Sequence, residues 1–260
     1  MNGIGAQEIC VTSAMRVCDF ISAMDTQRIP EWNCWYHIMN CGLPLKASGE
    51  TDFPCINGSR VGMGRVYVQL GQVDRIDYGK WCDGIAKGKS YVSDGYAHAL
   101  EFSVNGQGVG DEVKLDAAGN VTVKAKVAIA AAQPLGTADG GTIPEGNQRK
   151  IEIIVNGQVA GTKEIAADDK PHDLEFAIPI NKSSWVALRH FPSLHTNPVN
   201  VIVAGRPIRA SKQSVQWCLG TIEQLWKVRG QGIAVAERDE AEKTFQKATE
   251  IYQKLLQETD

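Results

Sequence analysis

The stretch Leu45-Lys-Ala-Ser-Gly-Glu-Thr-Asp-Phe-Pro54 decides how the first third of the chain is interpreted. Its apolar start predicts a short buried strand that ends near Ser48, and the acidic residues Glu50 and Asp52 follow directly. Parallel α/β folds keep their active sites at the carboxyl ends of their strands. Because residues two apart share one face of an extended segment, Glu50 and Asp52 are expected to point together at a metal or substrate. The alternative is a capped turn with two solvated carboxylates.

The residues before this stretch complete a strand–helix–strand pattern, which is typical of parallel α/β architecture. Val17–Ser22 is apolar enough for a buried strand, and residues 31–41 predict an aromatic-rich helix that ends at Gly42. His37 lies on this helix and is a candidate metal ligand. A packed or surface histidine is the other interpretation, because a single histidine on a helix carries no ligand pattern by itself.

Residues 97–210 have a different pattern, because the helical period disappears and polar residues alternate with valine and isoleucine. Such alternation is typical of strands in sheets that are wet on one face. Seven short strands are expected here, which predicts an antiparallel β-sandwich. Val-Asn-Gly-Gln occurs at 104–107 and again at 155–158, and Asn-Gly is a favoured two-residue hairpin turn.

The helical period returns from Ser211, and two helices are predicted in residues 211–260. The second helix could pack on its own chain, or its residues 235–257 could form a coiled-coil oligomerisation scaffold. Packing on its own chain is favoured, because two heptads are too few to indicate a coiled coil. The predicted fold class is therefore mixed α+β. It comprises a partial α/β lobe at residues 1–96, an antiparallel β-sandwich at 97–210 and a C-terminal helical segment.

Composition limits the classes of function. The net charge of −3 provides no electrostatic basis for binding nucleic acid or an anionic membrane. No apolar run reaches the roughly 20 residues of a membrane span. The N-terminus lacks the pattern of a signal peptide, so a cytoplasmic location is expected for the chain as it stands. The seven cysteines include no CxxC pair and are expected to be buried free thiols.

Six local strings, in order, resemble the C-terminal part of the CehA/McbA-type metallohydrolases. They are Asn33-Cys-Trp-Tyr-His-Ile-Met-Asn-Cys-Gly42, Ser48-Gly-Glu-Thr-Asp-Phe-Pro54, Gly64-Arg-Val-Tyr-Val68, Gly88-Lys-Ser-Tyr-Val-Ser-Asp-Gly95, Ser183-Ser-Trp-Val-Ala-Leu-Arg189 and His195-Thr-Asn-Pro198. The resemblance implies that residues 1–96 are the end of a TIM-like barrel of the PHP (polymerase and histidinol phosphatase) type, followed by a β-sandwich. It also implies a divalent metal that activates water for hydrolysis.

The resemblance assigns one metal ligand, Asp52, which matches the aspartate of the family's late Gly-Ser/Thr-Asp-x-His motif. The histidine expected two residues later is Pro54, and no histidine precedes His37, so the early His-x-His pair is absent. Asp52 with Glu50 and His37 is a poor shell for a catalytic ion, which needs about three protein ligands. Zinc, manganese or iron is therefore expected only if residues outside this chain complete the site, and this chain alone is expected to be inactive.

Other residues are candidates for binding a small-molecule substrate. Arg60 and Arg65 could hold an anionic group bidentately, or could simply pair with Glu50 and Asp52. His195 could contact a substrate, or could hydrogen-bond loops where the two lobes meet. No Gly-x-Ser-x-Gly string is present, and catalytic residues stay unassigned.

Two functions compete. In the first, the chain is the C-terminal portion of a metal-dependent hydrolase of esters, amides or phosphoesters, and the N-terminal half of its barrel is missing. An incomplete barrel would expose Val17–Ser22 and favour self-association. In the second, the chain is a non-catalytic β-sandwich module that binds carbohydrate or protein. The few aromatic residues expected in the sandwich, such as Phe176 and Trp185, have the alternation of core residues, which weakens the second interpretation.

Overall fold

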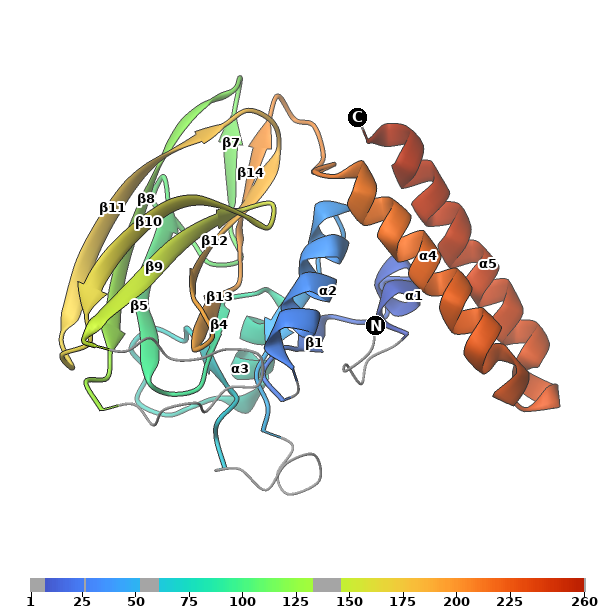
Figure 1. The fold of residues 1–260 in the computed structure, drawn as a ribbon, viewed down its shortest axis with the longest axis horizontal. Helices are drawn as coiled ribbons and strands as arrows, with labels where there is room; N and C mark the ends of the chain where they lie inside the picture. The colour runs from blue at the N-terminus through green and yellow to red at the C-terminus, as the bar shows by residue number, and fades with distance from the viewer. Residues whose placement is uncertain (1–7, 26, 52–60, 133–145, 260) are drawn as a thin grey trace.

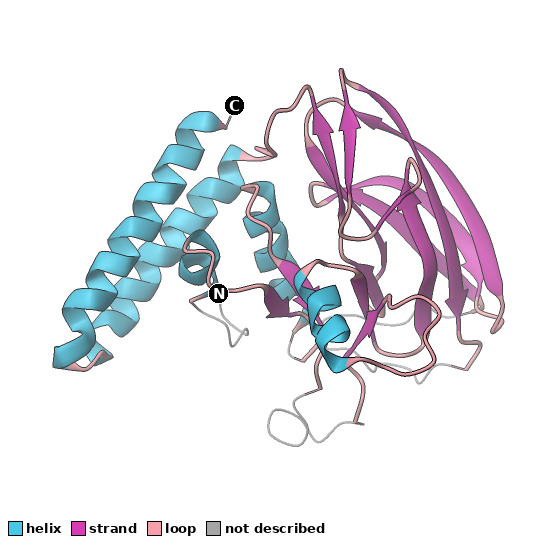
Figure 2. Ribbon diagram, turned by 180° about the vertical axis from the view of Figure 1, so that it is seen from behind, coloured by secondary structure: helices cyan, strands magenta, loops and turns pink. Residues whose placement is uncertain are grey.

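The computed structural model describes residues 8–25, 27–51, 61–132 and 146–259, which form a mixed α+β fold (Figures 1 and 2). Within these residues, two β-sheets pack as a sandwich, a small α/β unit lies beside the larger sheet, and two long helices pair beyond that unit. The described residues contain no closed barrel, and within the described part of residues 1–96 the parallel pairing expected of a TIM-like barrel is limited to two strands.

The α/β unit consists of β1 (Phe20–Ser22), α2 (Arg28–Asn40) and β2 (Lys46–Ser48). The two strands are parallel, with Ile21 opposite Ala47, and the strand–helix–strand pattern predicted from the sequence is confirmed. The first strand is shorter than predicted because the chain emerges into solvent before it, where Val17 is 73% exposed. A short helix, α1 (Ile9–Ala14), precedes it.

Helix α2 lies between the sandwich and the C-terminal helices (Figure 1). Apolar residues therefore surround it rather than line one stripe. Tyr36 packs against Trp185 of the larger sheet, with ring centroids 5.1 Å apart. The indole N–H groups of Trp32 and Trp35 donate to the carbonyls of Ala23 and Leu45 at 2.8 Å each. These two bonds fix the helix over the ends of β1 and β2.

The sandwich has two sheets. Among the described residues, the strands of the larger sheet follow the order β10 (Gln158–Ala166), β9 (Gln148–Val155), β12 (Ser184–His190), β13 (Leu194–Thr196), β4 (Ser90–Ser93) and β3 (Arg65–Val68). Two further strands extend this sheet, because β14 (Val199–Val203) pairs with β12 and also with β7 (Glu112–Leu115). The smaller runs in the order β11 (Pro171–Ile180), β8 (Gly119–Ile129), β5 (Ala97–Val104) and β6 (Gln107–Gly108). Inward-facing valine, isoleucine, leucine and phenylalanine side chains fill the space between them. The predicted antiparallel character holds, apart from the parallel β14–β7 pair.

Strands β3 and β4 join the sandwich rather than the α/β unit. They pair antiparallel with each other, connected through α3 (Tyr78–Ala86), and β4 pairs with β13. The sequence pattern predicts that both strands belong to the lobe formed by residues 1–96. The difference arises because a short strand carries no local signal of its partner, and Leu194–Thr196, about 100 residues later, supplies it.

Both Asn-Gly pairs form the hairpin turns predicted for them. Asn105 and Gly106 have φ of 47° and 80°, and Asn156 and Gly157 have φ of 51° and 86°. Positive φ at two successive residues matches the twist of the flanking strands. The second turn leads into β10, which was not predicted because its side chains are mostly exposed and lack a buried alternating face.

The C-terminal segment forms α4 (Lys212–Arg229) and α5 (Val235–Glu258), joined by a 3₁₀ turn at Gly230–Gly232. Helix α5 packs against α1 and α4 of its own chain, as predicted, and buries Ala248, Tyr252 and Leu255. The Tyr252 hydroxyl donates to the carbonyl of Cys10 at 3.0 Å, which ties the last helix to the first.

The described cysteines are free, as predicted. Cys10, Cys34, Cys41 and Cys218 are buried where α1, α2 and α4 meet, whereas Cys18 and Cys82 are partly exposed. Of the helices the structure describes, none has the length and apolar character to cross a membrane.

Candidate functional site

The carboxyl edge of the β1–β2 pair is where the sequence predicts a site. Strand β2 ends at Ser48, as expected, and the Ser48 hydroxyl donates to Glu50 Oε1. The other carboxylate oxygen, Oε2, is buried and has no hydrogen-bond partner among the described residues. An ionised oxygen in that position is unfavourable unless a cation or a donor meets it. Asp52 lies outside the described residues.

A glycine-rich segment fits closely against this edge. A side chain at Gly64 would collide with the carbonyl oxygen of Glu50 and with Met24, and one at Gly49 would collide with the backbone of Arg65. The Thr51 hydroxyl accepts from the Gly62 N–H at 2.9 Å and donates to the Gly64 carbonyl at 3.2 Å. The glycines are therefore needed for close packing of backbone on backbone, and they hold Glu50 at the end of its strand.

The end of β1 contributes a second polar pair. The Ser22 hydroxyl donates to Asp25 Oδ1 at 2.8 Å, and the Ala23 N–H donates to the Ser48 carbonyl at 2.9 Å. Both strands of the parallel pair thus end in a serine whose hydroxyl binds an acidic residue two or three positions later. The described part of this edge thus carries two acidic side chains, Asp25 and Glu50, whose oxygens are ligands of the kind that divalent ions prefer.

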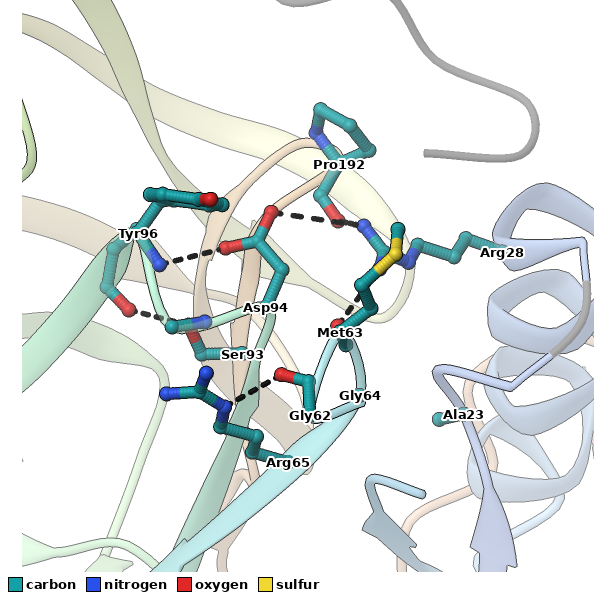
Figure 3. A network of polar contacts seen from close by, with 12 residues as sticks. Ala23, Arg28, Gly62, Met63, Gly64, Arg65, Ser93, Asp94, Tyr96 and Pro192 are labelled. Atoms are coloured by element: carbon teal, nitrogen blue, oxygen red, sulfur yellow. Dashed lines mark hydrogen bonds and ion pairs between the residues drawn. The ribbon is translucent and has the colours of Figure 1, made fainter. Parts of the chain in front are cut away.

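A buried ion pair that sequence analysis did not identify lies close by (Figure 3). Arg28 is only 2% exposed, and its Nη1 donates to the Pro192 carbonyl at 2.7 Å and lies 3.9 Å from Asp94 Oδ2. Its Nη2 donates to the Met63 carbonyl at 3.3 Å, while Asp94 Oδ1 accepts the N–H of Tyr96 at 2.9 Å. Arg28 therefore joins three chain segments that are distant in sequence, which no local pattern could indicate.

Arg65, a candidate for binding an anionic substrate, is held by neutral groups. Its Nε donates to the Gly62 carbonyl at 2.5 Å and its Nη1 donates to the Tyr67 hydroxyl at 3.2 Å. Gly95 has no side chain to interfere with the guanidinium. Neither of these bonds joins Arg65 to an acidic residue. Arg60 lies outside the described residues.

His37, the third candidate metal ligand, is directed to α4. Its Nδ1 lies 3.0 Å from the Ser214 hydroxyl oxygen, and its ring stacks on Trp217 with centroids 4.4 Å apart. Burial lowers the pKa of His37 below its ordinary value. The imidazole thus contributes to packing between α2 and α4, and these contacts do not bring it together with Glu50.

His195 is enclosed rather than available to a substrate. It has no exposed surface, and the rings of Trp32, Trp35 and Tyr36 surround it. Nδ1 lies 2.7 Å from the Thr196 carbonyl, which only accepts, so Nδ1 carries the proton. Nε2 therefore accepts from the Tyr36 hydroxyl at 2.5 Å. Burial lowers the pKa of His195 to about 3. The predicted substrate contact is replaced by the alternative, a histidine that bonds elements where the lobes meet.

The hydrogen-bonded chain continues from Tyr36 toward the surface. The Tyr36 hydroxyl accepts from Arg189 Nη1 at 3.4 Å, and Arg189 pairs with Glu152 through two bonds of 2.8 and 2.7 Å. Burial, opposed by the Arg189 charge, raises the pKa of Tyr36 to about 12. The tyrosine is therefore neutral at physiological pH and can donate to His195. These residues position α2 against the larger sheet.

The described residues do not form a complete metal site. They include no group of three or more His, Cys, Asp or Glu side chains arranged around a common point that could hold an ion. Of the two candidate ligands that the structure describes, Glu50 lies at the carboxyl edge of β2 and His37 is directed to α4. Comparison with protein-family models finds no match, and comparisons with curated proteins and with solved structures find none either.

Proposed function

We propose that this chain is the C-terminal part of a PHP-like metal-dependent hydrolase of the CehA/McbA type. Its reaction class is hydrolysis of an ester, amide or phosphoester by water that zinc, manganese or iron activates. The observation that carries the proposal is the buried Oε2 of Glu50, which has no hydrogen-bond partner among the described residues and lies at the carboxyl end of a parallel strand. This is the position that α/β enzymes use for their ligands.

The described residues alone do not fit a catalytic ion. Glu50 supplies one carboxylate there, whereas a catalytic site needs about three protein ligands and an open position. Asp52, two residues later, is the second ligand in this proposal. The remaining ligands come from residues that complete the barrel, and the chain by itself does not hydrolyse substrate.

The open edge of β1 supports the existence of such a completing segment. The far edge of β2 is occupied by Asn197, whose amide bonds both the N–H and the carbonyl of Ala47. Among the described residues β1 pairs only with β2, and Phe20 on it is 42% exposed. An unpaired strand edge with exposed apolar side chains is a template for another strand.

Metal titration tests the proposal. We expect calorimetric titration of the chain with Mn²⁺ and Zn²⁺ to show weak binding, because the ligand set is incomplete. Glu50→Gln and Asp52→Asn should each weaken that binding by at least about tenfold, since each removes an anionic oxygen. Glu175→Gln, at an exposed position on β11, is the matched control and should change nothing. Binding that is tight and survives Glu50→Gln would contradict the assignment.

Sedimentation velocity tests the open strand edge. We expect the sedimentation coefficient of the chain to rise with protein concentration, because exposed apolar groups on an unpaired edge promote association. Phe20→Asp should suppress this rise, whereas Ile76→Asp, at another exposed apolar position, should not. A chain that stays monomeric over a hundredfold range of concentration would argue against an incomplete barrel.

A further inference from the structure

A groove opens along the edge of the sandwich, where the two sheets separate. Its walls come from β3 and β4 of the larger sheet and from β5 and β6 of the smaller one, and its volume is about 580 Å³. Small-molecule sites commonly occupy roughly 300–1,000 Å³. The groove exists only because β3 and β4 belong to the sandwich, and it is separate from the carboxyl edge of β2.

One wall of the groove is a pair of tyrosines. Tyr67 and Tyr91 are directly opposite each other on β3 and β4, and their rings stack with centroids 4.9 Å apart and planes at 9°. His98 fixes the pair, because its Nδ1 lies 2.9 Å from the Tyr91 hydroxyl and its ring meets Tyr67 edge to face. Both tyrosines are partly exposed. The result is a preorganised aromatic surface, which needs little ordering when a ligand binds.

The opposite wall, from β5, combines the apolar residues Ala99, Leu100 and Phe102 with the polar residues Glu101 and Ser103, and charged groups lie at the mouth of the groove. Lys89 pairs with Asp111, and Glu101 accepts from Lys126 at 2.9 Å. Gln69 and Ser103 add neutral donors and acceptors. The charges at the mouth are therefore mostly paired, while carboxylate oxygens retain lone pairs that can accept further hydrogen bonds.

We propose that this groove binds a neutral saccharide. A sugar ring has an apolar C–H face, which suits an aromatic ring, and a rim of hydroxyl groups, which suits carboxylates, amides and hydroxyls. A wholly apolar ligand would desolvate Lys89 and Asp111 without replacing their bonds to water. Lys89 and Lys126 are already paired with Asp111 and Glu101, so they are not free to hold an anionic ligand. A neutral saccharide therefore suits both the tyrosine rings and the polar groups of this groove.

Affinity electrophoresis tests this proposal. The chain is run in native gels that contain mixed-linkage β-glucan, xylan or galactomannan, and we expect at least one of these neutral polysaccharides to retard it. Tyr67→Ala should weaken the interaction about tenfold, whereas Tyr67→Phe should keep it, because the ring face and not the hydroxyl makes the contact. Tyr78→Ala, which removes an exposed aromatic ring on α3, is the matched control and should bind like the parent chain.

Three results would overturn the proposal. The first is the absence of retardation in all three neutral gels, and the second is equal retardation of the parent chain and a folded Tyr67→Ala variant. Thermal melting of each variant establishes that it is folded. Stronger retardation by polygalacturonate than by the neutral polymers would also contradict a neutral ligand. None of these measurements uses a metal or an enzymatic readout, so their outcome is independent of the proposed hydrolase site.

Discussion

Replacing Asn197 with alanine is expected to lower the free energy of unfolding by about 3–5 kcal/mol, because three buried hydrogen bonds are lost together. The Asn197 amide accepts from the Ala47 N–H at 2.8 Å and donates to the Ala47 carbonyl at 3.1 Å and to the Ser90 hydroxyl at 2.8 Å. The side chain has no exposed surface, so water does not replace these bonds without a structural change. Asn197 acts as a one-residue substitute for a neighbouring strand and attaches β2 to the sandwich.

Urea unfolding monitored by circular dichroism measures this loss. Asn181→Ala is the matched control, because Asn181 is exposed in the turn before β12, and it should change the unfolding free energy by no more than about 0.5 kcal/mol. If Asn197→Ala cost less than about 1 kcal/mol, the α/β unit would have to be attached mainly through α2, and the role given to Asn197 would be wrong.

Acid is expected to destabilise the fold through His195. The pKa of this buried side chain is about 3 in the folded protein, below the ordinary value of 6.5, because burial disfavours the charged ring. As the pH falls below 6.5, the unfolded chain binds a proton at this position and the folded chain does not. The unfolding free energy therefore falls by up to about 1.4 kcal/mol per pH unit until the pH nears 3. Burial lowers the pKa of His190 as well, which adds to the loss in the same direction.

The proton linkage of His195 is isolated by comparing variants. We expect His195→Gln to reduce the slope of the unfolding free energy against pH, between pH 6 and 4, by nearly the full value of about 1.4 kcal/mol per pH unit. This is the slope that corresponds to the binding of one proton by the unfolded chain. Tyr36→Phe is the matched control. It removes the donor to Nε2 and destabilises the same cluster, but it leaves the histidine buried, so its slope should match that of the parent chain. Equal slopes for the parent and His195→Gln would contradict a neutral, buried His195.

The candidate site could be predicted only in part. The apolar run followed by Ser48-Gly-Glu correctly indicated a strand that ends at Ser48, two residues before the acidic Glu50, because that signal is local. The other functional candidates contact residues that are distant from them in the sequence. His195 is enclosed by three aromatic rings from α2, about 160 residues earlier, and Arg28 reaches Asp94 and the carbonyl of Pro192. Burial of this kind depends on where whole elements pack, which residue spacing does not contain.

The sequence by itself determined the local structure of this protein. Alternating valine and isoleucine produced the strands of the sandwich, Asn-Gly produced its two tight hairpins, and spacings of three and four produced α4 and α5. These features depend on neighbours a few residues apart. Only the tertiary structure decided that β3 and β4 join the sandwich, which creates the tyrosine groove, and that Asn197 closes the edge of β2. The physical reason is that a short strand can satisfy its backbone with any suitable edge, so the partner is chosen by packing of the whole chain.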